Sequence, residues 1–114
     1  MSEAETYPTY QAISIQLEAP RELDNKPLSE LTMRPPTTSD VVIAQSQAQN
    51  PIHKDVLLYA NLTNTTEDFI QSLAFYDFKQ LERAFDTFMC RVSEHVDRRA
   101  LFLPKPSAAT ASGN

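Results

Sequence analysis

Glycine, cysteine and tryptophan are nearly missing from this sequence of 114 residues, which has one glycine, one cysteine and no tryptophan. The glycine, Gly113, lies far from any predicted strand or helix, so no glycine-rich loop can bring backbone amides close to a phosphate. This excludes the common nucleotide-binding loops. The single cysteine, Cys90, cannot form a disulfide within the chain, which agrees with a reducing compartment.

Basic residues and long apolar runs are also scarce. Ten Lys and Arg against fifteen Asp and Glu give a formal net charge of −5, which repels the phosphate backbone of nucleic acids. The longest wholly apolar runs are about five residues, such as 56–60, whereas a helix needs roughly 20 to cross a bilayer. The first ten residues contain no basic residue and do not resemble a secretion signal. We therefore expect a soluble protein that binds neither nucleic acid nor membrane.

Residues that could carry catalysis or hold a metal stand apart from one another. His53 and His95 have no second histidine or cysteine at the spacing of a metal site, and each is expected on a surface or helix face. Cys90 lies among apolar residues without a nearby base, which favours a small buried role. Helix caps and solvated faces explain three aspartates, Asp40, Asp77 and Asp86. We therefore expect no catalytic residues, no cofactor and no metal.

The chain divides into a central region and two polar ends. Residues 1–11 and 104–114 are small and polar, so their burial could not repay the entropy of ordering them. We predict that both are disordered tails and that residues 12–103 form a single α+β domain. A chain of this length has no room for a second domain.

Two strands are predicted near the start. The segments at about 12–17 and 29–34 alternate apolar and polar residues, which is typical of strands with one buried face. Between them lie prolines and the pair Asp24-Asn25, which set turn geometry. We predict an antiparallel hairpin whose apolar face packs on helices, because an isolated hairpin is marginally stable in water.

A joint of ten residues, LTMRPPTTSD, follows the hairpin. Pro35 and Pro36 remove two backbone donors and end the strand, and Thr37 with Asp40 three residues later resembles a capping box. Arg34 is expected to point from the polar face of the strand. The joint therefore predicts a switch from strand to helix at Thr37.

Three or four helices are predicted after the joint. A short or exposed one follows directly, a second begins at Asn50-Pro51, and a brief third surrounds 69–73. From Ala74 to about 103 no proline or glycine interrupts the chain, and apolar residues recur at steps of three and four. This spacing predicts one long final helix.

The apolar stripes of the second and last helices have two interpretations. They either complete the core, or part of them stays exposed and binds a partner, because the last helix has more aromatic surface than a thin hairpin and short helices can cover. The partner interpretation assigns binding to Ile52, Val56, Tyr59, Phe78, Leu81, Phe85 and Phe88. Phe75, Tyr76 and Met89 lie beside this stripe.

Several motifs occur in a characteristic order. They comprise Leu31, Thr32, Arg34, Pro36, Thr37 and Asp40 in the joint, Leu57, Leu58, Leu62 and Thr63 in an apolar helix ending in a Leu-Thr step, and Asp77, Phe78, Leu81 and Phe88 near the end. This order, over about residues 12–89, resembles the small tail assembly chaperone family of long-tailed bacteriophages, which includes the tail protein E type and its relatives in Mu-like phages. Asn25 and Asn64 replace two glycines common in that family, and asparagine tolerates the left-handed conformation.

The resemblance implies a function. Such proteins are made in the host cell cytoplasm, bind the long tape measure protein, keep it soluble until the tail tube assembles around it, and are absent from the mature virion. The tape measure protein is then the expected partner. Separately from the resemblance, the apolar stripes of the second and last helices could instead take a second copy of this chain. Two other classes remain open: a structural tail completion or tube-associated virion protein, and a regulator that binds one host protein.

Overall fold

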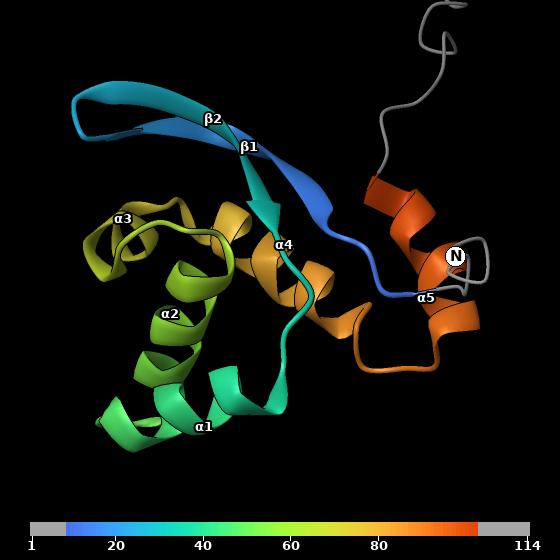
Figure 1. Cartoon of the computed structure of the whole chain (residues 1–114). Coiled ribbons are helices and arrows are strands. Elements are labelled where there is room, and N and C mark those ends of the chain that lie inside the picture. The colour runs from blue at the N-terminus through green and yellow to red at the C-terminus, as the bar shows by residue number, and fades with distance from the viewer. Residues whose placement is uncertain (1–8, 103–114) are drawn as a thin grey trace, which may run out of the picture.

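The computed structural model describes residues 9–102 and has an N-terminal hairpin that lies over a set of helices (Figure 1). β1 (Ile13–Leu23) and β2 (Lys26–Met33) pair antiparallel. The helices in the described residues are α1 (Thr38–Gln47), α2 (Pro51–Leu62), α3 (Glu67–Ser72), α4 (Phe75–Asp86), α5 (Val92–Arg99) and the 3-10 helix η2 (Ala100–Phe102). The predicted α+β class and the N-terminal hairpin are confirmed.

The strands are longer than predicted and meet at a two-residue turn. Asp24 and Asn25 both have positive φ, 55° and 66°, which matches the twist of a tight hairpin. Pro20 lies within β1 without ending it, because each strand of a two-stranded sheet has a free edge that needs no donor. Asn64, after α2, also has a positive φ of 58°. Asn25 and Asn64 thus adopt the left-handed conformation expected of them.

The core lies between the hairpin and the helices. The inward face of the hairpin and the inner faces of α2, α3 and α4 contribute side chains that are at most 8% exposed. Burial of one such Leu, Ile or Phe side chain contributes roughly 1.5–3 kcal/mol. The largest fully buried apolar side chains are Ile13, Met33, Leu62, Ile70 and Leu81.

The long final helix predicted from Ala74 is wrong, because the chain breaks between α4 and α5 and so gives more helices than the three or four expected. His95, just after the break, is fully buried, and its ring stacks on Phe88 at 4.9 Å. Its Nε2 accepts the backbone N–H of Gln11 at 3.0 Å, so Nδ1 carries the proton and donates to the Thr87 carbonyl, also at 3.0 Å. These tertiary bonds outweigh helix continuation, and they correct the expected surface position of His95.

Candidate functional site

The predicted partner-binding residues lie on α2, on α4 and just after α4, and most of them belong to the core. Four are buried, two are half-buried and one is largely exposed. In that order they are Val56, Tyr59, Leu81 and Phe88, then Phe78 and Phe85, then Ile52 at 68% exposure. The four buried residues are part of the core and offer little surface to a partner in this structure. Partner binding by the other three stays a prediction.

A row of aromatic rings leads from the core to the surface of α4. The ring of Tyr59 lies 5.7 Å from the rings of both Phe78 and Phe85. Phe78 stacks on Phe75 at 6.4 Å, and Phe75 is 71% exposed. The Lys79 ammonium lies 5.5 Å from the centre of the Phe75 ring. We call Phe75, Phe78 and Phe85 the aromatic face. Phe78 and Phe85 at its inner end pack against Tyr59, and Phe75 at its outer end is exposed to solvent.

Charged groups of both signs lie near this face. Burial raises the pKa of Asp55, and the nearby charge of Glu82 raises it further, whereas Lys54 opposes the shift. Burial also raises the pKa of the Tyr59 hydroxyl, with smaller contributions from the negative charges of Asp55, Glu82 and Asp86. Acidic groups from α2 and α4 thus lie near Tyr59, at the inner end of the face, and we call Asp55, Glu82 and Asp86 the acidic rim; Glu82 also pairs with Lys79 at 2.7 Å.

Asp77 fixes α4 against the hairpin. Four residues of β1, 17–20, lie opposite the single β2 residue Ser29, because Gln16 pairs with Glu30 and Arg21 with Leu28. Two backbone N–H groups of this bulge donate to Asp77, from Glu18 at 2.8 Å and from Ala19 at 3.0 Å. The Asp77 side chain is fully buried, so the expectation of a cap or solvated position is wrong.

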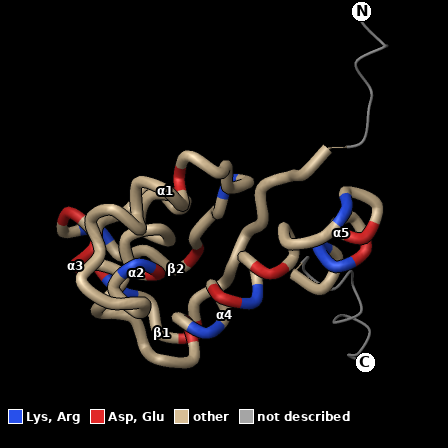
Figure 2. The backbone as a smooth tube through the Cα atoms, turned by 90° about the horizontal axis from the view of Figure 1, so that it is seen from below, with Lys and Arg blue, Asp and Glu red and all other residues tan. Residues whose placement is uncertain are grey.

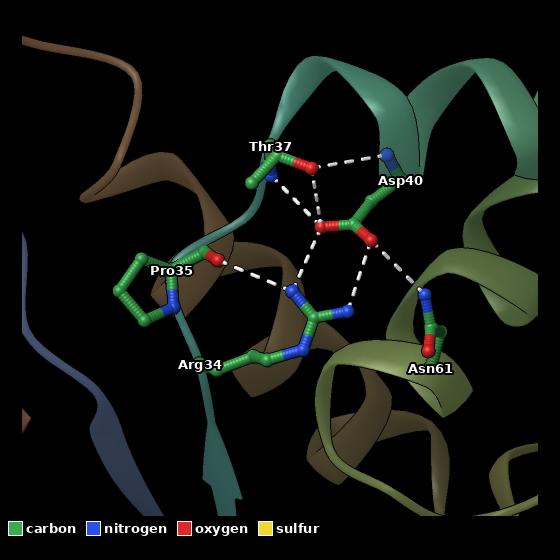
Figure 3. Close-up of polar contacts among 5 residues, drawn as sticks. All are labelled: Arg34, Pro35, Thr37, Asp40 and Asn61. Atoms are coloured by element: carbon green, nitrogen blue, oxygen red, sulfur yellow. Dashed lines mark hydrogen bonds and ion pairs between the residues drawn. The ribbon is translucent and has the colours of Figure 1, made fainter.

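The joint forms a second polar anchor, shown in Figure 3. Thr37 and Asp40 form the predicted capping box, in which the Thr37 hydroxyl accepts the Asp40 N–H and the Asp40 carboxylate accepts the Thr37 N–H. The Arg34 guanidinium donates hydrogen bonds to both carboxylate oxygens of Asp40, at 2.8 and 2.9 Å. Asn61 of α2 donates to the same carboxylate at 3.2 Å (Figure 3), so the joint holds β2, α1 and α2 together.

Charge pairing at the joint was missing from the sequence prediction. The hydrogen bonds from Arg34 hold the pKa of Asp40 well below its usual range, and bonds from Thr37 add to this effect against the cost of burial. The Arg34 side chain turns toward the helix start and does not simply project from the strand. Arg34 and Asp40 are six residues apart with Pro35 and Pro36 between them, and this spacing is the sequence signal that could have indicated their ion pair.

The other polar groups also have structural partners. His53 Nε2 lies 2.8 Å from Glu67 on α3, and the half-buried Cys90 donates its thiol hydrogen to the Thr87 carbonyl. Across residues 9–102, no group of three or more His, Cys, Asp or Glu could hold a metal ion. Nor does that range contain a helix long and apolar enough to cross a membrane.

These features define a small α+β module whose polar residues position helices and whose open surface is aromatic, as in a protein that binds other proteins. A family model described as phage tail assembly chaperone proteins, E, or 41 or 14, matches residues 14–89. The chain belongs to this family. No curated protein and no solved structure matches the chain significantly. The match includes the hairpin, the joint and α4, whereas α5 lies after it.

Proposed function

We propose that this protein binds the phage tape measure protein in the host cell cytoplasm, keeps it soluble until the tail tube assembles, and is absent from the mature virion. The family match over residues 14–89 is the observation that carries the proposal. The family assists tail assembly, and the tape measure protein is the tail component that most needs such help, because a long helical chain exposes apolar stripes before the tube encloses it.

The aromatic face has properties suited to this client. Phe75 and its neighbour Tyr76 are 71% and 58% exposed, and Phe78 continues the apolar surface toward the core. Packed rings lose little conformational freedom when a partner covers them, so they contribute efficiently to binding. An amphipathic helix could lay its apolar stripe on this face.

The charge around the face indicates which helices bind best. Asp55, Glu82 and Asp86 form the acidic rim, and the whole chain has a net charge of −5. A client helix with Lys or Arg beside its apolar stripe would find complementary charge at this rim. Once bound, the remaining acidic surface would keep separate complexes apart by repulsion.

Mass spectrometry of infected cells and of purified particles tests whether the protein acts transiently. We expect its peptides in the cell lysate during tail assembly, together with those of the tape measure protein, and none in particles purified to constant composition. The major tail tube protein serves as the internal reference in both samples.

Peptides of this chain in purified particles, at a constant ratio to the tube protein, would contradict the proposal. Such a result would indicate a structural tail completion or tube-associated protein.

A further inference from the structure

Helix α1 leaves two large apolar side chains exposed to solvent. Surface helices normally bury their larger apolar residues and expose their polar ones. α1 buries only Asp40 and the small Ala44, whereas Val42 and Ile43 are 59% and 49% exposed. Val41 packs partly against the core, so α1 presents two of its three large apolar side chains to the outside.

A shallow groove runs beside these residues. It has a volume of about 290 Å³ and is lined by Asp40, Ile43, Ala44, Gln47, Leu57 and Asn61. Its one charged group, Asp40, is neutralised by Arg34 at 2.8 Å. The groove lies between α1 and α2 and could take an apolar side chain from outside. We call Val42, Ile43 and this groove the α1 face.

The α1 face carries almost no net charge. No Asp, Glu, Lys or Arg occurs from Val41 to Ile52, and Figure 2 shows α1 without charged residues after its first turn. The helices α2 to α5 all contain charged residues. Two copies of a chain with a net charge of −5 repel each other, so a contact between copies is least opposed where charge is missing.

Polar groups on α1 would not oppose such a contact. The Ser46 hydroxyl donates to the Ile43 carbonyl at 2.8 Å, so its hydrogen needs no water. Gln45 and Gln47 each carry a donor and an acceptor and can pair with the same residues of an identical helix. These polar groups can therefore all be satisfied in a two-fold contact between identical helices.

We infer that α1 packs antiparallel against α1 of a second copy, with Val42 and Ile43 of each copy toward the groove of the other. Both views show α1 apart from α4, with α1 beside α2 (Figures 1 and 2). The dimer therefore leaves both aromatic faces open. The dimer does not depend on which protein the aromatic face binds. Either proposal, the α1 dimer or binding of the tape measure protein, can therefore fail while the other holds.

Sedimentation equilibrium of the purified full chain, from about 1 to 300 µM, tests the inference. We expect a reversible dimer in the natural chain and at least a tenfold higher dimer dissociation constant in Val42→Glu. The matched control is Phe75→Glu, which also adds one negative charge at an exposed apolar residue and should leave the constant unchanged. Circular dichroism and urea midpoints verify that both variants fold.

Three results would overturn the inference. The natural chain could stay monomeric over the whole range, or Val42→Glu could dimerise as tightly as the natural chain. Equal weakening by Val42→Glu and Phe75→Glu would show general charge repulsion in place of a contact at α1.

Discussion

Replacing Asp77 with alanine should lower the free energy of unfolding by about 3–5 kcal/mol, since hydrogen bonds to a charged group are worth roughly 1.5–3 kcal/mol each. The substitution removes the acceptor for the N–H groups of Glu18 and Ala19, which the bulge of β1 leaves without a strand partner. The fully buried site also excludes the water that would replace the lost acceptor. Urea denaturation at pH 7 measures the change.

Asp86→Ala is the matched control for Asp77→Ala. Asp86 is an exposed aspartate on the same helix, and its side chain makes no hydrogen bond or ion pair with the described residues, so its loss should change stability by no more than about 0.5 kcal/mol. Asp77→Asn should fall between the two, because it keeps one acceptor but turns an NH₂ group toward a backbone N–H. Equal midpoints for Asp77→Ala and Asp86→Ala would show that the bulge does not depend on Asp77.

Replacing Asp40 with asparagine should cost about 2–3 kcal/mol at pH 7, where the carboxylate accepts charge-assisted hydrogen bonds from Arg34 and holds the cap at Thr37. We place the figure below the sum of the single bonds because the Arg34 side chain is 44% exposed and partly screened by water. Thr37→Ala, which removes only the cap, should cost about 0.5–2 kcal/mol.

The effect of Asp40 should depend on pH. The folded protein holds the pKa of Asp40 below that of the unfolded chain, which lies near 4. The stabilisation is therefore complete above about pH 5 and is lost as the pH falls below 4 toward the folded-state pKa. Urea midpoints at pH 7, 5 and 3 should show a smaller difference between the natural chain and Asp40→Asn at pH 3. A difference that is the same at all three pH values would contradict the charge pairing.

Features set by neighbouring residues were predictable from the sequence. The hairpin follows from alternation over short segments, and the cap at Thr37 depends on a residue three positions away. The left-handed Asn25 and Asn64 likewise reflect local backbone geometry. In each case the decisive interaction lies within the stretch of sequence that shows the pattern.

Features set by distant residues were not predictable in this way. Asp77 receives hydrogen bonds from residues 58 and 59 positions earlier, and His95 from Gln11, 84 positions earlier. The break between α4 and α5 lies beside this buried histidine, and no proline or glycine marks it. Periodicity therefore indicated a helix but could not indicate where tertiary contacts end it.

The candidate site shows the same limit. The apolar stripe of α4 was identified from its spacing, yet one stripe serves both the core and the surface. Leu81 is fully buried and Phe75 is 71% exposed on the same helix. Which residues stay open depends on where α2 and the hairpin lie over α4, and this is fixed by the long-range bonds of Asp77 and by the packing of Tyr59.

Co-expression with the phage's own tape measure protein tests the central claim most directly, because it asks whether this chain keeps that client soluble. The readout is the fraction of tape measure protein in the supernatant with the natural chain, with Phe75→Glu, and with Val96→Glu, which adds the same charge at a 53% exposed residue of α5. We predict that the natural chain and Val96→Glu move most of the tape measure protein from the pellet to the supernatant and that Phe75→Glu does so at least several-fold less. A tape measure protein that stays in the pellet beside the folded natural chain would contradict the chaperone function, and full rescue by Phe75→Glu would contradict binding at the aromatic face.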